Sequence, residues 1–135
     1  MYEWDREPDE VVVSAMGLPC MMRRGPLRNW CGYIGVPAQH FLYGKEYDEY
    51  IPELKQSMGS FFRVHGGITF SGFIGEDREL WWIGFDCAHL GDAIPAYYER
   101  VPSDMWGAYK NIEYVKQECL NLATQIYKAT EEVEQ

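Results

Sequence analysis

The sequence predicts an α+β domain in which an antiparallel β-sheet of about four to five strands is packed by a long C-terminal amphipathic helix. Two observations predict the sheet: runs of β-branched and aromatic residues, and the glycines and prolines that separate them. A helical spacing of apolar residues near the C-terminus predicts the helix. A chain of 135 residues suits one domain, and we expect residues 1–135 to form it.

The first part of the predicted sheet lies in residues 11–36. Glycine and proline interrupt this stretch so often that a long helix is excluded. Short strands such as residues 11–15 and 32–36 fit between the interruptions. Residues 47–56 are polar, and we expect one or two helical turns there, interrupted at Pro52.

Three further runs, residues 61–65, 68–72 and 80–86, are rich in aromatic and β-branched side chains. A Gly-Gly pair separates the first two runs, and residues 75–78 supply turn residues before the third, which predicts an antiparallel meander. Apolar side chains occupy both faces of the third run. We therefore expect a central strand that is covered on both sides, or on one side by a ligand.

The C-terminal helix is predicted from one apolar stripe with spacings of three, four and seven residues. Asn111 is a suitable N-cap, and Glu113 is favourable in the first turn. The stripe consists of Ile112, Val115, Cys119, Leu122, Ile126 and Val133. We expect these side chains to pack on the sheet.

The net charge of −9 is concentrated at the two ends of the chain. Residues 1–10 carry five acids and one base, and residues 131–135 carry three acids, which leaves −2 for residues 11–130. We interpret the ends as mobile, solubilising segments. The acidity argues against nucleic acid as a partner, and its position at the ends argues against mimicry of DNA.

Compartment is predicted from what the sequence lacks. No apolar run reaches the roughly 18 residues that a membrane helix needs, and the N-terminus is acidic where a signal peptide would be basic. We therefore expect a cytoplasmic protein with no membrane partner. The four cysteines lie 11, 56 and 32 residues apart, which matches neither a metal knuckle nor a small disulfide scaffold, so we expect free thiols.

The first candidate site follows His65. The pair Gly66-Gly67 could aim backbone N–H groups at an anion such as phosphate, and the Thr69 and Ser71 hydroxyls could add donors. The alternative is a hairpin turn in which the glycines supply positive φ angles and His65 ends a strand.

The second candidate site is the loop after the third run, where Asp86, Cys87, His89 and Asp92 lie within seven residues. The two carboxylates and His89 could converge on a divalent metal together with a histidine from elsewhere, His65 or His40. The alternative is a helix start at which an aspartate caps N–H groups and His89 is an ordinary surface residue.

Other side chains could also carry chemistry. Cys87 could act as a nucleophile with His89 or His65 as its base, although no cysteine-protease signature surrounds it. A metal site built from all three histidines is a further alternative. Arg23 and Arg24 form a basic concentration with Arg28, which suits a phosphate group or is simply a solvated loop.

Several blocks resemble a group of small bacteriophage and prophage proteins. The blocks are residues 31–37 (CGYIGVP) with His40 and Tyr43-Gly44, residues 64–72 (VHGGITFSG), residues 81–92 (WWIGFDCAHLGD), and Glu118 with Leu122-Ala123. Together they span about residues 30 to 125. The resemblance implies a role in counter-defence, such as sequestering a host nucleotide signal or blocking a host enzyme.

Three classes of function follow from these residues. The preferred one is binding of a small nucleotide-like ligand in a pocket to which His65, Asp86, His89 and Asp92 contribute, with Trp81 or Trp82 as an aromatic wall. The second is a small hydrolase acting on a phosphorylated substrate, with a histidine as general base and an aspartate orienting it or holding a metal. The third is an acidic protein that inhibits a host protein through its surface. The sequence requires no cofactor, and it leaves a homo-oligomer open.

Overall fold

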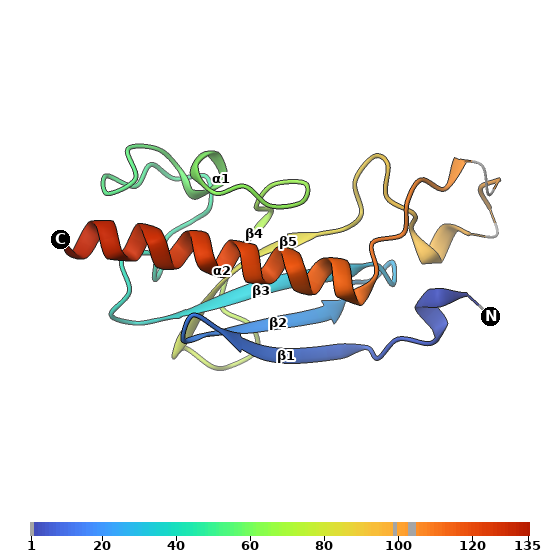
Figure 1. Cartoon of the computed structure of the whole chain (residues 1–135), viewed down its shortest axis with the longest axis horizontal. Helices are drawn as coiled ribbons and strands as arrows, with labels where there is room; N and C mark the ends of the chain where they lie inside the picture. Colours follow the sequence, from blue (N-terminus) through green and yellow to red (C-terminus); the bar gives the residue numbers. More distant parts are fainter. Residues whose placement is uncertain (1, 99, 103–104) are drawn as a thin grey trace.

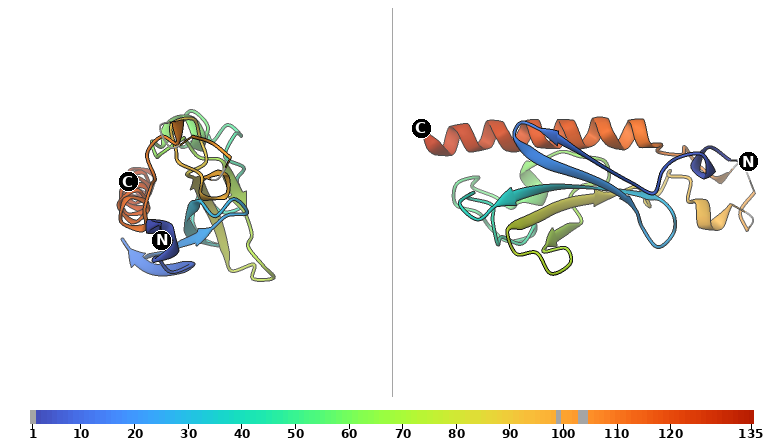
Figure 2. Two further views of the ribbon diagram at one scale, coloured as in Figure 1. Left: turned by 90° about the vertical axis from the view of Figure 1, so that its right-hand side faces the viewer. Right: turned by 90° about the horizontal axis from the view of Figure 1, so that it is seen from below.

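The computed structural model describes residues 2–98, 100–102 and 105–135. Over these residues the chain forms a five-stranded sheet with the order β1-β2-β3-β5-β4, in which every neighbouring pair is antiparallel. The strands are β1 (Glu10–Ala15), β2 (Leu18–Arg24), β3 (Trp30–Pro37), β4 (Phe70–Gly72) and β5 (Leu80–Asp86). The long helix α2 (Ile112–Glu134) lies along one face of the sheet (Figures 1 and 2). The predicted α+β fold is confirmed.

The helix α2 begins as its sequence predicts. Asn111 is the N-cap, and its side chain accepts a hydrogen bond from the backbone N–H of Tyr114 at 2.9 Å. The face that packs on the sheet consists of Val115, Cys119, Leu122, Ala123, Ile126 and Ala129. Val133, which the periodicity also assigned to this face, remains exposed in the last turn.

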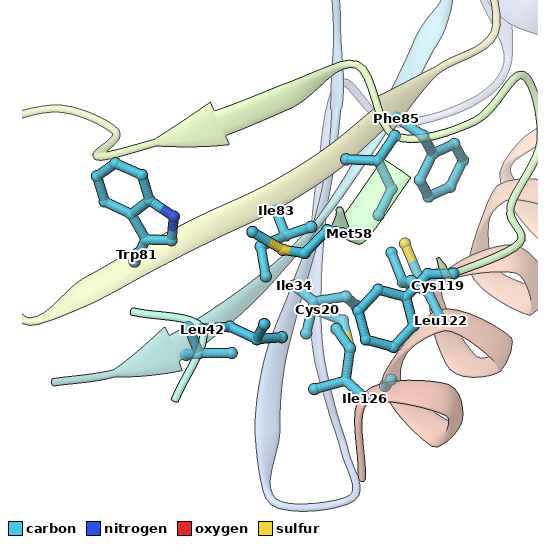
Figure 3. Close-up of a cluster of buried hydrophobic side chains, with 14 of the residues drawn as sticks. Cys20, Ile34, Leu42, Met58, Trp81, Ile83, Phe85, Cys119, Leu122 and Ile126 are labelled. Carbon is cyan, nitrogen blue, oxygen red and sulfur yellow. The ribbon is translucent and has the colours of Figure 1, made fainter. Parts of the chain in front are cut away.

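The core lies between α2 and the sheet. In Figure 3, Cys119, Leu122 and Ile126 of α2 lie beside side chains of the central strands β3 and β5. Gly32 lets the helix come close, because a Cβ atom at this position would meet the Phe85 ring and the Cys119 sulfur. All residues from Trp81 to Phe85 are buried, and their side chains alternate between the two faces, with Trp81, Ile83 and Phe85 on the core side.

The predicted strand at residues 61–65 is wrong. The short helix α1 (Met58–Phe61) ends there, and the chain then runs alongside α2 in an irregular conformation until β4. Side chains of α2 satisfy its backbone: Gln125 bonds to both the N–H and the C=O of Arg63, and Glu118 accepts from the N–H of His65. An apolar run alone does not reveal that a helix, and not a strand, supplies its hydrogen-bond partners.

Two other local predictions need correction. Residues 47–56 form turns closed by an isolated bridge between Ile51 and Gln56, and the helical turn expected there comes later, at α1. Gly66 and Gly67 do not connect two strands of a hairpin, because β4 begins only at Phe70 and pairs with β5. Both glycines have positive φ angles and form a turn outside the sheet.

The acidic N-terminus makes specific contacts. A 3-10 helix (Glu3–Asp5) places Trp4, which is buried, against the rings of Tyr98, Trp106 and Tyr109. The mobility of the two acidic ends stays a prediction.

The four cysteines are free and buried, as expected from their spacing. In the described part of the chain, no helix combines the length and hydrophobicity that crossing a membrane would require.

Candidate functional site

The buried carboxylate of Asp92 is the centre of a polar network beside β5. His65 Nε2 lies 2.9 Å from Asp92 Oδ1 and 2.8 Å from Asp92 Oδ2. Lys110 Nζ lies 3.2 Å from Oδ1, and the backbone N–H of His89 donates to Oδ2 at 3.0 Å. Burial by itself raises the pKa of Asp92, but the hydrogen bonds from His65, from the His89 backbone and from Lys110 outweigh it, so the pKa lies below its usual value. Asp92 is therefore an ionised group that is only 7% exposed.

His65 connects this carboxylate to the first turns of α2. Its Nδ1 lies 2.8 Å from the hydroxyl of Tyr114. If the Nε2 proton faces Asp92, Nδ1 accepts a hydrogen bond from Tyr114, and the order carboxylate, imidazole, hydroxyl is the arrangement that moves a proton in many hydrolases. Burial and the nearby Glu118 carboxylate raise the pKa of Tyr114, so its hydroxyl stays protonated at neutral pH.

The loop that carries Asp92 is held against the segment before α2. Ala108 donates its N–H to Gly91 O at 2.8 Å, and Ala93 donates to Ala108 O at 3.0 Å. The backbones approach so closely that a Cβ atom at Gly107 would overlap the carbonyl group of Gly91. Gly107 has a φ angle of 73°, which other residues rarely adopt. These contacts fix the loop that supplies both Asp92 and His89.

His89 brings the two predicted segments together. Its ring centroid lies 6.0 Å from that of His65, and the ring covers Gly66, where a Cβ atom would overlap it. His89 Nε2 lies 3.2 Å from Asp86 Oδ1, but it makes no aligned hydrogen bond. Asp86 also accepts from the Thr69 hydroxyl at 2.9 Å. His65, Gly66, Thr69, Asp86, His89 and Asp92 therefore form one cluster.

A cavity of about 590 Å³ opens beside this cluster. Its volume lies within the range of small-molecule sites. It is lined by Ala88, His89, Leu90, Gly91, Asp92, Ile94, Tyr97, Val101, Met105, Trp106 and Gly107. Three apolar or aromatic side chains of the lining are unusually exposed: Leu90 completely, Met105 to 72% and Tyr97 to 40%. His89 lines the cavity directly, whereas His65 is not part of the lining and reaches it through Asp92.

Trp82 and Ser71 do not join this cluster, contrary to the single-pocket hypothesis. Trp82 pairs with Gly35 and lies over it, on the sheet face opposite the core and α2. The Ser71 hydroxyl donates to Glu46 and accepts from the N–H of Tyr47. Its neighbours Trp81 and Ile83 face the core, so Trp82 points to the other side of the sheet, and it is not part of the cavity lining.

Arg23 and Arg24 also lie elsewhere. Arg24 is held by Glu7 and by the carbonyl oxygen of Trp4, and its guanidinium lies over the Trp30 ring. Arg23 lines a separate shallow hollow of about 580 Å³ on the face opposite α2. Neither side chain reaches the Asp92 network.

The expectations of a metal site and of a cysteine nucleophile find no support in the geometry. Over residues 2–98, 100–102 and 105–135, no three His, Cys, Asp or Glu side chains are grouped to hold a metal ion. His40 bonds to Thr130 near the end of α2, far from the His65 partner Tyr114 near its start, so the three histidines do not converge. Cys87 is buried, and burial together with Asp92 raises its pKa well above the usual thiol range, which disfavours a thiolate.

One of the two N–H groups of the proposed anion cradle, that of Gly67, is taken by an internal hydrogen bond, as is the N–H of the preceding His65. The N–H of His65 donates to Glu118, and the N–H of Gly67 donates to Val64 O at 2.8 Å. The Glu118 carboxylate therefore lies beside this turn, where a phosphate would have to bind.

Sequence reasoning missed Lys110 and Tyr114 and gave Glu118 no role in the site. It also missed the cavity wall that Ile94, Tyr97, Val101, Met105, Trp106 and Gly107 form. The spacing of four residues between Tyr114 and Glu118 was a usable signal, because residues at that spacing lie on one face of a helix. Lys110 precedes the N-cap, and no helical spacing indicates it. Comparison of the chain with family models, curated proteins and solved structures found no match. Function is therefore inferred from the site.

Proposed function

We propose that this protein binds a small molecule in the cavity beside Asp92 and His89. The observation that carries the proposal is the exposure of Leu90, Met105 and Tyr97 around one concave surface next to a fixed polar network. Exposing such side chains to water is unfavourable, and their concentration around a cavity is typical of a ligand-binding site.

The lining favours a planar, uncharged ligand. Tyr97 and Trp106 supply aromatic surface, and Asp92, the carboxylate among the described lining residues, is already paired with His65 and Lys110. A nucleobase or nucleoside fits this chemistry. Of the nucleotide-like ligand expected from the sequence, this proposal retains the base and omits the phosphate. A phosphate is disfavoured, because the Asp92 carboxylate lines the cavity and the Glu118 carboxylate accepts from the N–H of the neighbouring His65. A counter-defence role would then consist of withholding such a molecule from the host.

Calorimetric titration of the full chain with adenosine and guanosine, and with their 5′-monophosphates, tests this proposal. We expect a nucleoside to bind more tightly than its monophosphate. Leu90→Asp should weaken binding by at least about ten-fold, because it places a carboxylate on the rim. Tyr50→Asp is the matched control, since Tyr50 is exposed but does not line the cavity. If all four compounds fail to bind, or if both variants weaken binding equally, the proposal is wrong.

A hydrolase is the second candidate, and the ordered contact of Asp92, His65 and Tyr114 favours it. These groups could take a proton from a nucleophile or return one to a leaving group. We expect Tyr114→Phe, which keeps the ring and removes the hydroxyl, to reduce hydrolysis of p-nitrophenyl phosphate by about 100-fold or more. If the wild-type protein shows no hydrolysis, this candidate fails while the binding proposal stands.

Inhibition of a host protein through the acidic surface is the third candidate. It would use the acidic residues at the two ends of the chain and would need no small molecule. Failure of both the calorimetric and the hydrolytic assay would favour it over the other two.

A further inference from the structure

Strand β1 forms an open edge of the sheet. It pairs with β2 alone among the described strands, and Figures 1 and 2 show it at the outer side of the sheet. The opposite edge strand, β4, has only three residues, whereas β1 has six. A long edge strand presents unpaired backbone groups that another strand can bind.

The backbone groups that face outward can be identified from the hydrogen bonds to β2. Arg24 donates its N–H to Asp9 O, which makes Asp9 and Arg24 a hydrogen-bonded pair of the antiparallel ladder. Because such pairs alternate along the strands, the N–H and C=O groups of Glu10, Val12 and Ser14 point away from β2.

Apart from Glu10 at its start, this edge strand lacks the features that normally prevent pairing. Residues 11–15 read Val-Val-Val-Ser-Ala, with no proline, lysine or other charged residue. Val12, on the face of β1 away from the core, is 59% exposed. Valine favours β-strands, where its side chain packs against that of a neighbouring strand. The strand is therefore suited to accept a partner.

We propose that the partner is a second copy of this chain, joined through antiparallel pairing of β1 with β1 about a two-fold axis at Val12. In this register Val12 lies opposite Val12 of the other copy, and Val11 lies opposite Val13. Glu10 lies opposite Ser14. Each outward N–H group of Glu10, Val12 and Ser14 then meets an outward C=O group of the other copy, and the two sheets become one continuous sheet.

The self-complementarity of this strand selects a second copy over an unrelated strand. Valine meets valine along the centre, and the one acidic side chain faces a neutral serine, so no like charges are opposed. A shift by one residue would place side chains of the core face opposite side chains of the other face, which the pleat of a continuous sheet does not allow.

Helix α2 adds apolar surface beside the same edge. At 100° per residue, Leu120 and Tyr127 lie on the side of α2 opposite Tyr114 and Gln125, which contact the segment before β4. The side away from that segment is the side toward β1 (Figure 2). Tyr127 is exposed on this side of α2. The two-fold axis would place the same side of α2 of the second copy opposite it, across the β1–β1 interface.

Sedimentation analysis of the full chain at concentrations up to about 100 µM tests the proposal. We expect the wild-type protein to be a dimer. Val12→Lys should raise the dissociation constant at least about ten-fold, because it places two positive charges opposite each other. Mixing V12K with V12E should restore a dimer of the two variants. Tyr50→Lys is the control and should leave the dimer unchanged, since Tyr50 is exposed away from β1.

Disulfide formation tests the register independently. Residues opposed in a hydrogen-bonded pair have Cα atoms about 5.5 Å apart, which a disulfide can span. Val12→Cys should therefore cross-link two copies under mild oxidation, whereas Ser14→Cys should not, and the four native cysteines are buried. A monomeric wild-type protein, a V12K variant that still dimerises, or equal cross-linking at the two positions would each overturn the proposal.

Discussion

His65 and Asp92 are 27 residues apart in the sequence, yet His65 Nε2 lies within 2.9 Å of both carboxylate oxygens of Asp92. This contact joins the irregular segment before β4 to the loop after β5. Tyr114 extends it to the first turns of α2. Three parts of the chain are thus held together beside the cavity.

Replacement of Asp92 by asparagine should destabilise the protein in a pH-dependent way. The folded-state pKa of Asp92 lies below its ordinary value of 3.8, so the folded protein binds this proton less readily than the unfolded chain does. The ionised carboxylate therefore stabilises the fold at pH values above the ordinary pKa, and this contribution is lost as the pH falls through the lower folded-state value. At about pH 7 we expect Asp92→Asn to reduce the free energy of unfolding by about 2 to 4 kcal/mol.

Urea denaturation of wild type and variant between about pH 2.5 and 7 measures the difference. It should shrink below about pH 4. Asp48→Asn, at an exposed position, should change little at any pH. A difference that stays constant down to the lowest pH would show that the charge of Asp92 is not what stabilises the loop.

The predictable parts of this fold are those in which local pattern and tertiary role agree. The stripe from Val115 to Ile126 has the helical period because the same side chains pack on the sheet. Residues 80–86 were predicted as a strand covered on both faces, and β5 has these bounds. Residues 61–65 were misread because their hydrogen-bond partners are side chains of α2, which no local pattern encodes.

The candidate site was predictable in part for the same reason. The density of reactive groups between Asp86 and Asp92 pointed to the correct loop, and His65 does contact it. Tyr114 was missed because it lies on a helix that the sequence presented as structural. Trp81 or Trp82 was expected to form a wall of the pocket, but neither lines the cavity, because Trp81 packs in the core and Trp82 lies on the opposite face of the sheet.

Glu7 should contribute to stability far more than the other acids near the N-terminus. Its side chain is largely buried and accepts hydrogen bonds from Trp30 Nε1, from the Tyr109 hydroxyl and from the backbone N–H of Ile112, in addition to pairing with Arg24. Glu7→Ala leaves these three donors without this acceptor and removes the carboxylate that pairs with the largely buried Arg24 guanidinium, which keeps the carbonyl oxygen of Trp4. We expect the free energy of unfolding to fall by about 3 to 5 kcal/mol in chemical denaturation.

Asp9→Ala is the matched control for Glu7. Asp9 also lies near Arg24, at 3.8 Å, but its side chain is 95% exposed, so the change should be below about 1 kcal/mol. Equal effects of the two substitutions would mean that the acidic end is held no more firmly at Glu7 than at its exposed positions.

The turn between β1 and β2 offers a stabilising substitution. Met16 and Gly17 both have positive φ angles, 55° and 76°, as a type I′ turn requires. Methionine adopts this conformation at a cost, whereas asparagine tolerates it. We expect Met16→Asn to raise the free energy of unfolding by about 0.5 to 1 kcal/mol, measured by thermal denaturation. Gly17→Ala should lower it by about 1 kcal/mol, and destabilisation by both changes would contradict this account of the turn.

Substitutions at Gly66 and Gly67 distinguish the backbone strain of this turn from the contact between Gly66 and the His89 ring. Both have positive φ angles, 68° and 80°, so an alanine at either position strains the backbone. Only at Gly66 would the new Cβ atom also overlap the His89 ring, since nothing lies near the corresponding position at Gly67. The two substitutions therefore differ mainly in the displacement of His89.

We expect Gly67→Ala to lower the free energy of unfolding by about 1 kcal/mol, the cost of the backbone strain, and Gly66→Ala to lower it by about 2 to 3 kcal/mol, because the ring must also move. The His89 ring resonances in a proton–carbon NMR spectrum should shift in Gly66→Ala and remain in place in Gly67→Ala. Because His89 lines the cavity, adenosine binding should weaken only in Gly66→Ala. If the two variants lose equal stability and leave the His89 resonances unchanged, the turn and the cavity are independent, and the segment after His65 has no part in the site.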